Sequence, residues 1–81
     1  MIRLFNATLF GIRLHRVRLR EKLSQAQLAK DIGTTQAAIS KCERGECGDI
    51  SVNTLLVLAK RLGVSLDYLV GMAQSSSPSQ T

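Results

Sequence analysis

A short helix with a well-defined start and stop constrains the middle of this sequence more than any other feature. Ser24 can cap its first turn, and Gln27 three residues later completes a capping-box pattern. The helical spacing of apolar residues then runs to Ile32, and Gly33 follows as a stop signal. Ala29 is small enough to let a neighbouring helix approach closely, while Gly33 permits a tight corner. The sequence therefore predicts a second helix directly after the corner, crossing the first at a steep angle.

The second helix of this pair is predicted to start after Thr34 or Thr35 and to reach Arg44, with Gly45 as its stop. At 100° per residue, its polar, small and basic side chains fall within about 140° of one another. This arc consists of Gln36, Ala37, Ser40, Lys41 and Arg44. The opposite arc is apolar except for Glu43, whose carboxylate would be costly to bury without a partner.

The composition of the polar arc suits a helix that lies in the major groove of DNA. A glutamine can pair with an adenine edge, a lysine can bind guanine acceptors or a phosphate, and an alanine leaves room for a thymine methyl group. The arc also lacks a carboxylate, which the phosphates of DNA would repel. An ordinary solvated helix face is the alternative explanation for Gln36 and Lys41.

Three further helices are predicted from apolar spacing and glycine stops, and no segment alternates in polarity long enough to form a strand. One runs from Gly11 to Leu23, one from a cap at Ser51 to Gly63, and a short one from Ser65 to Gly71. In the first, the side chains expected to face water are Arg13, Arg16, Arg20 and Lys22. In the next, the expected apolar face is Val52, Leu55, Leu56, Ala59 and Leu62. The predicted fold class is all-α.

The size and charge of the chain limit its organisation and its partners. Its 81 residues and 44% hydrophobic content suit one domain with a single modest core. We predict an N-terminal extension over residues 1–10, a helical domain over 11–71, and a disordered, serine-rich tail over 72–81. The net charge of +5 favours a polyanionic partner. With no apolar run approaching the roughly 20 residues of a spanning helix, and no signal peptide, we expect a soluble, cytoplasmic protein that does not bind membranes.

The sequence offers little for catalysis or metal binding. Cys42 falls on the inward arc and is expected to be a small buried thiol, whereas Cys47 is expected in an exposed loop, where oxidation is a minor alternative. His15 has no Cys, Asp or Glu at ligand spacing on its helix face. No nucleophile, general base and oxyanion-binding group can be assembled from one His and scattered Ser residues. We therefore expect no enzymatic activity, no metal and no cofactor.

The stretch from Gln25 to Gly45, QAQLAKDIGTTQAAISKCERG, resembles the Cro and phage-repressor family of helix-turn-helix proteins, also called the xenobiotic response element family. The resemblance continues through LLVLAKRLGVSLDYL at residues 55–69 and covers Phe10 to Gly71. It implies a five-helix, lambda-repressor-like DNA-binding domain over residues 11–71. It also implies a sequence-specific transcriptional regulator whose third helix reads a palindromic operator in double-stranded DNA. A repressor is favoured, and an activator is the alternative.

The resemblance assigns roles to individual residues of this chain. The residues expected to face DNA bases are Gln36, Ala37, Ser40 and Lys41. Gln25, Thr35 and Arg44 are expected to contact the DNA backbone. The family pattern also implies an ion pair between Arg18 and Glu43, which agrees with the inward position of the Glu43 carboxylate. The loop over residues 46–50 is about one residue longer than the common family form, so no contact is carried over to it.

The implied partners are DNA and a second copy of the chain. A homodimer would match a palindromic operator, and its contact is expected in surplus apolar surface of the last two helices. The residues considered for this surface are Leu66, Tyr68, Leu69, Val70 and Met72. The segment over residues 1–10 is a second candidate, through Ile2, Leu4, Phe5 and Leu9. An alternative function stays open at this point: an antitoxin-like interaction module that binds a partner protein and DNA.

Overall fold

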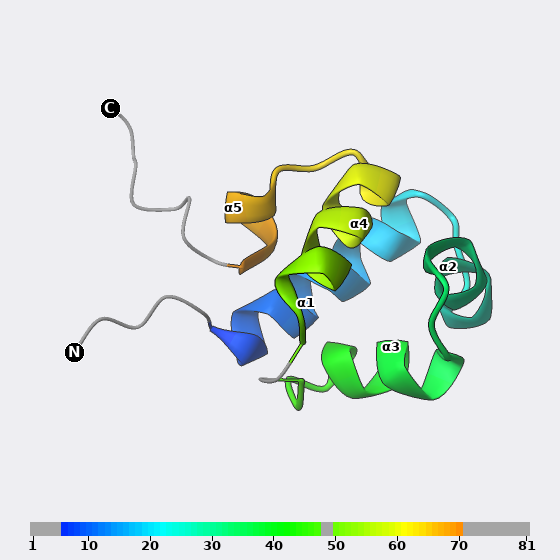
Figure 1. Ribbon diagram of the computed structural model, residues 1–81, viewed down its shortest axis with the longest axis horizontal. Coiled ribbons are helices and arrows are strands. Elements are labelled where there is room, and N and C mark those ends of the chain that lie inside the picture. The colour runs from blue at the N-terminus through cyan, green and yellow to red at the C-terminus, as the bar shows by residue number, and fades with distance from the viewer. Residues whose placement is uncertain (1–5, 48–49, 71–81) are drawn as a thin grey trace.

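The computed structural model describes residues 6–47 and 50–70, and over these residues the only regular elements are helices (Figure 1). They are α1 (Ala7–Arg20), α2 (Gln25–Ile32), α3 (Gln36–Glu43), α4 (Val52–Leu62) and α5 (Leu66–Val70). The predicted all-α, five-helix fold is confirmed. No described helix has the length and apolar character needed to cross a membrane. The predicted tail at 72–81 and the first half of the predicted extension lie outside the described residues.

Local hydrogen bonds begin and end the two central helices. The Ser24 hydroxyl accepts from the Gln27 backbone N–H at 3.0 Å, and the Thr35 hydroxyl accepts from the Ala38 N–H at 3.1 Å. Thr35, and not Thr34, is therefore the cap of α3. Gly33 ends α2 with a φ of 79°, in the left-handed region that glycine adopts without strain. The capping box is only half formed, because the Gln27 side chain donates to Asp31 instead of returning to Ser24.

The first helix starts four residues earlier than the sequence predicts and also ends earlier, at Arg20. Asn6 caps it, since its side-chain oxygen accepts from the Leu9 N–H at 2.9 Å. Gly11 therefore lies inside α1, where the helix passes very close to α3. A Cβ atom added to Gly11 would lie 2.5 Å from the Cys42 carbonyl oxygen. The absence of a side chain at this position allows the approach of the two helices.

The core lies where the five helices face one another. Its fully buried large side chains are Phe10, Leu14, Leu28, Ile39, Leu58, Leu62 and Leu69. The predicted face of α4 is partly wrong: Val52 and Leu56 are 66% and 49% exposed, and Leu58 is buried in their place. Leu69 and Val70 are also buried and cannot supply the surplus surface expected of them. The reason is that α4 turns Leu58, with Leu55 and Leu62, toward the other helices.

Two further expectations about exposure are wrong for the same reason, that chain segments distant in sequence pack together. Arg13 is half-buried and does not point freely into water: its Nη1 donates to the Tyr68 carbonyl oxygen at 2.6 Å, and its guanidinium carbon lies 4.5 Å from the centre of the Tyr68 ring. This contact attaches the short α5 to α1. Cys47 is only 5% exposed, and it lines a cavity of about 220 Å³ together with Cys42 and Leu58.

Replacing Gly11 with alanine is expected to lower the free energy of unfolding by about 1–3 kcal/mol, because the new Cβ would push α1 away from α3. Urea unfolding followed by circular dichroism measures the change. Alanine in place of glycine inside an unobstructed helix ordinarily stabilises by about 1 kcal/mol. A more stable Gly11→Ala variant would therefore contradict the close approach.

Candidate nucleic-acid interface

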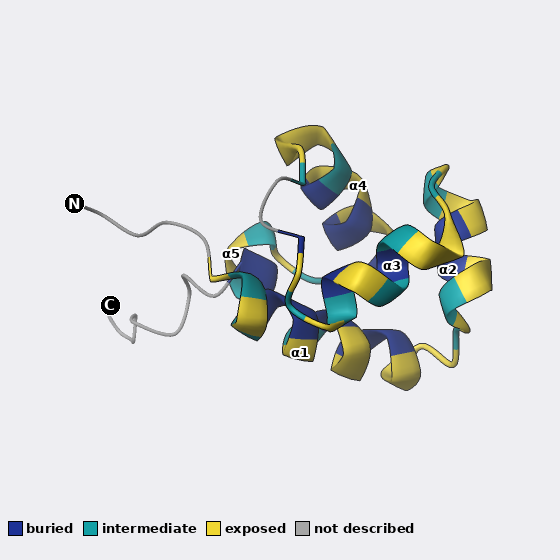
Figure 2. Ribbon diagram, turned by 90° about the horizontal axis from the view of Figure 1, so that it is seen from below, coloured by how far each residue is buried: buried dark blue, intermediate teal, exposed yellow. Residues whose placement is uncertain are grey.

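One side of α3 is packed into the protein and the other is open to solvent (Figure 2). Ile39 and Cys42 are 2% and 6% exposed and attach the helix to the core. We call the opposite side the outer face of α3, and it consists of Gln36, Ala37, Ser40, Lys41 and Arg44. All of these are exposed except Ser40, which is half-buried. The structure thus brings the expected base-facing residues together on one accessible surface.

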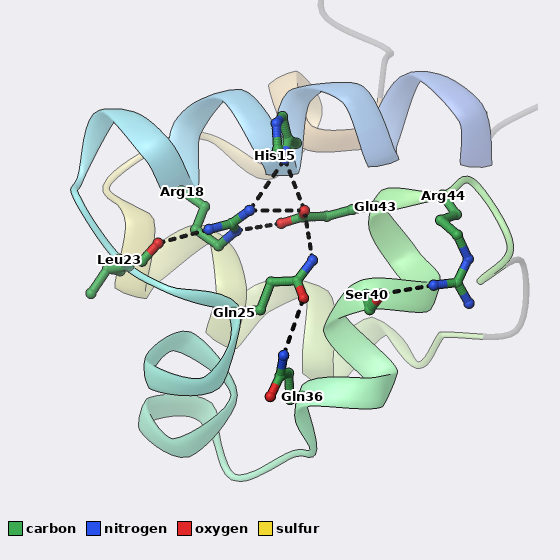
Figure 3. Close-up of polar contacts among 8 residues, drawn as sticks. All are labelled: His15, Arg18, Leu23, Gln25, Gln36, Ser40, Glu43 and Arg44. Carbon is green, nitrogen blue, oxygen red and sulfur yellow. Dashed lines mark hydrogen bonds and ion pairs between the residues drawn. The ribbon is translucent and has the colours of Figure 1, made fainter.

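The guanidinium group of Arg44 lies back along the outer face of α3. Its Nη1 donates to the Ser40 hydroxyl oxygen at 2.7 Å (Figure 3). Its Nη2 donates to Glu46 Oε1 at 3.4 Å. Both Arg44 and Glu46 are exposed, so this ion pair adds little to stability. The Ser40 hydroxyl and the Arg44 guanidinium group therefore lie next to each other on the outer face of α3 and are joined by a hydrogen bond.

A buried ion pair joins the inner side of α3 to α1. Arg18 Nε donates to Glu43 Oε2 at 2.5 Å, and Arg18 Nη2 donates to Glu43 Oε1 at 3.0 Å. The two side chains are 8% and 7% exposed, and the arrangement is bidentate. The remaining Arg18 nitrogen, Nη1, donates to the Leu23 carbonyl oxygen at 2.8 Å. The structure places Arg18 and Glu43 in the contact that the family pattern implies.

Two further side chains, from different helices, lie within hydrogen-bond distance of Glu43 Oε1 (Figure 3). His15 Nδ1 in α1 lies 2.9 Å from Glu43 Oε1, and Gln25 Nε2 in α2 donates to it at 3.1 Å. Burial raises the pKa of the Glu43 carboxyl, but hydrogen bonds from Arg18, His15 and Gln25 lower it more, so the pKa lies below its ordinary value. The hydrogen bond to Glu43 in turn raises the pKa of Arg18.

His15 has a contact that the sequence reasoning missed. The sequence argues against His15 as a metal ligand or a catalytic base but gives it no structural role, and within the described residues no group of three or more His, Cys, Asp or Glu side chains could hold a metal ion. The sequence feature that could have indicated this contact is the position of His15 three residues before Arg18, which places both side chains on one face of a helix. The absence of metals and cofactors stays a prediction.

Gln25 stands between the ion pair and the outer face of α3. Its amide nitrogen is directed at Glu43, and its amide oxygen accepts from Gln36 Nε2 at 3.5 Å. Its side chain, expected to contact the DNA backbone, is thus already engaged with two protein groups. Thr35 lies at the start of α3 with its hydroxyl used as the helix cap.

Comparison with known proteins gives a consistent set of similarities. A sequence profile described as Helix-turn-helix matches residues 14–69. Repressor protein C2 of Salmonella phage P22 is 42% identical over 65 residues, which are 80% of this chain and 30% of the repressor. The chain thus spans less than a third of the length of that curated relative.

Solved structures show the same fold. The P22 c2 repressor protein in complex with synthetic operator 9T matches with a TM-score of 0.73 and 39% identity, covering 79% of this chain and 96% of that one. The restriction-modification controller protein C.AhdI from Aeromonas hydrophila matches with a TM-score of 0.71 and 32% identity, covering 78% of this chain and 94% of that one. Hydroxypropylphosphonic acid epoxidase from S. wedmorenis matches with a TM-score of 0.77 and 29% identity, covering 84% of this chain but 36% of the enzyme.

Replacing Arg18 with alanine is expected to lower the free energy of unfolding by about 3 kcal/mol, because it leaves the Glu43 carboxylate buried without its bidentate partner. Thermal unfolding followed by circular dichroism checks this. Arg16→Ala is the matched control, since Arg16 is exposed on the same helix and its loss should change stability by no more than about 0.5 kcal/mol. Unaltered melting of the Arg18 variant would dismiss a structural role for the pair.

Proposed function

This chain belongs to the Cro and phage-repressor family of helix-turn-helix proteins, and from that premise we propose that it is a sequence-specific, DNA-binding transcriptional repressor. The observation that carries the proposal is the outer face of α3, which is exposed, free of carboxylates and mounted on a helix whose other side is anchored in the core. Such a helix fits the major groove, where base edges are distinguishable. The net charge of +5 supports a polyanionic target. We also propose that the protein acts in the cytoplasm.

The proposed base contacts come from the outer face of α3. The Gln36 amide can pair with an adenine edge, the Lys41 ammonium with guanine acceptors, and the Ala37 methyl with a thymine methyl group. The Ser40 hydroxyl can serve either a donor or an acceptor on a base. Because Ser40 accepts from Arg44 in the isolated protein, binding of DNA would exchange that contact for one with a base or a phosphate.

The proposed contacts with the DNA backbone come from the starts of α2 and α3 and from Arg44. At a helix start, backbone N–H groups and the helix dipole favour a phosphate. Thr35 and Gln25 stand at these starts, at the edge of the outer face. Because the side-chain amide nitrogen of Gln25 donates to Glu43, we assign the phosphate contact of Gln25 to its backbone N–H. Arg44 reaches a phosphate by leaving Glu46.

We propose that the protein acts as a homodimer on a palindromic operator, since one module carries a single reading helix. Of the candidates for the dimer contact, Leu69 and Val70 are buried, whereas Leu9, Leu66 and Tyr68 are half-buried. Exposed apolar side chains lie instead on α1, at Ile12 and Leu19, and on α4, where Val52 and Leu56 are one helical turn apart. We assign the contact to the two residues of α4. Met72, Ile2, Leu4 and Phe5 lie outside the described residues.

The alternative of an antitoxin-like module has less support, because the relatives are named as a repressor and a controller protein. The similarity to the epoxidase extends over 36% of that enzyme and carries no residue-level argument for catalysis here. We therefore propose a function in DNA binding without enzymatic activity.

Binding sequences selected from a random DNA pool are expected to contain a two-fold symmetric site. On that site, Gln36→Ala or Lys41→Ala should weaken binding by about 1–3 kcal/mol and relax preference at one base position, measured by titration at fixed salt. Lys60→Ala is the control for Lys41→Ala, because it removes a lysine charge from an exposed position on α4. It should weaken DNA binding only slightly, and by the same factor on all DNA sequences. An equal loss on random DNA would count against base reading by Gln36 or Lys41.

Light scattering at tens of micromolar is expected to give the mass of a dimer. Leu56→Asp should weaken dimerisation by at least about tenfold, because it places a charge in the proposed apolar contact. Leu19→Asp, which changes an equally exposed apolar residue on α1, should leave the mass unchanged. A wild-type protein that is strictly monomeric would contradict the proposed dimer.

A further inference from the structure

We propose that the cavity lined by Cys42, Cys47 and Leu58 binds a small organic monocarboxylate with an apolar body, and that this ligand withdraws Lys41 from DNA. The cavity has a volume of about 220 Å³ and lies where the end of α2, the inner side of α3 and the start of α4 meet. Lys41 belongs both to its lining and to the outer face of α3. Binding of the ligand stands apart from the proposed function, whereas its effect on DNA rests on that function.

The floor of the cavity is apolar. Ile39 and Leu58 are buried there together with the two cysteine side chains, and Ile32 and Ile50 form half-buried walls. Water in such a space finds few polar partners, so an apolar group displaces it at little cost. In other proteins an apolar cavity of about 150 Å³ is large enough to bind benzene. The volume here therefore admits one six-membered ring or a branched chain of similar size.

The mouth of the cavity is polar and carries a positive charge. Lys41 lines the cavity and is also exposed, so its flexible stem can hold the ammonium group over the mouth. No carboxylate among residues 6–47 and 50–70 forms an ion pair with it. The hydroxyl groups of Ser51 and Thr54, in the same lining, lie 2.9 Å apart, and only one of them can donate to the other. One O–H group therefore remains to donate to a ligand.

The combination of floor and mouth selects the chemical class of the ligand. A carboxylate is ionised at neutral pH, accepts hydrogen bonds and is attracted to the Lys41 ammonium group. An uncharged ring would use the floor alone, and a small inorganic anion would use the mouth alone. A ring or short branched chain that bears one carboxylate uses both, and benzoate is a molecule of this kind.

A bound carboxylate changes what the outer face of α3 offers to DNA. The Lys41 ammonium group, proposed above to bind guanine acceptors, would be held by the ligand instead. The ligand also brings a negative charge to the edge of a face that has none, and this charge repels the phosphates of DNA. Ligand and DNA therefore oppose each other, and each lowers the affinity of the other by the same factor.

The first experiment titrates the full chain, labelled with ¹⁵N and without DNA, with three probes. Benzoate carries both the ring and the charge, benzyl alcohol carries the ring alone, and acetate carries the charge alone. Benzoate is expected to shift the backbone amide signals of Ala38, Cys47 and Thr54 and to saturate at millimolar concentrations, the range open to a ligand of this size. Benzyl alcohol should bind about 3- to 10-fold more weakly, and acetate should give no saturable shift.

Matched variants test the two halves of the cavity. Ala38→Leu fills the cavity from α3 and should weaken benzoate binding at least about tenfold, whereas Ala26→Leu makes the same change at an exposed position on α2 and should leave it unchanged. Lys41→Met keeps an apolar stem and removes the charge. It should weaken benzoate binding about 3- to 10-fold and benzyl alcohol binding less than about twofold, with Lys60→Met as the control on α4. If Ala38→Leu does not fold, Cys47→Met fills the same space.

The second experiment measures operator binding with and without benzoate. Sodium acetate at the same concentration replaces sodium benzoate in the reference sample, so that the ionic strength is equal. Saturating benzoate is expected to lower the affinity of the wild type for the selected operator by about tenfold. In Ala38→Leu the affinities with benzoate and with acetate should agree within about twofold.

The outcomes separate the cavity from the proposed function. A wild type that binds no DNA overturns the proposed function, yet the benzoate titration still tests the cavity. A wild type without saturable shifts in benzoate overturns the binding site, and so do equal shifts with acetate, which would show an adventitious ion only. Benzyl alcohol that binds as tightly as benzoate overturns the carboxylate class. Saturation by benzoate with unchanged operator affinity overturns the withdrawal of Lys41.

Discussion

The Glu43 carboxylate is turned toward the protein interior and needs hydrogen-bond donors from outside its own helix. Arg18 and His15 supply them from α1, and Gln25 supplies one from α2, so three helices meet at one side chain. A buried ion pair of this kind adds little stability compared with apolar side chains, but stranding either partner is costly. The main effect of the Arg18–Glu43 pair is therefore on the placement of the helices. The pair holds α3 in one position relative to α1 and α2.

Close packing supports the same placement from a different direction. Gly11 lets α1 approach the backbone of α3 at its C-terminal end, while Ile39 and Cys42 fill the space beneath the helix. The outer face of α3 takes no part in this packing. Its polar groups are therefore accessible, and the packing on the inner side holds their backbone in place. On the proposed function, a surface built in this way would lose little conformational freedom on binding DNA.

The features that the sequence predicted well depend on neighbours a few residues apart. The caps at Ser24 and Thr35 and the stop at Gly33 each involve a bond within one helical turn, so a local pattern is sufficient. The contacts that were missed depend on packing. Arg13 meets Tyr68 across 55 positions of the chain, and His15 meets Glu43 across 28. The outer face of α3 was predictable because helical periodicity alone separates its two sides.

Cys42 and Cys47 are both buried and line the same cavity, so the reaction of their thiols with a reagent would report local opening of the structure. Cys42 lies on the inner side of α3, and Cys47 lies in the chain that follows it, with 6% and 5% exposure. A thiol so well covered reacts with a soluble reagent only when the surrounding structure opens. The labelling rate of Cys42 would therefore measure how often α3 separates from the core. Ligands that hold α3 in place would slow that chemistry without touching either sulfur atom.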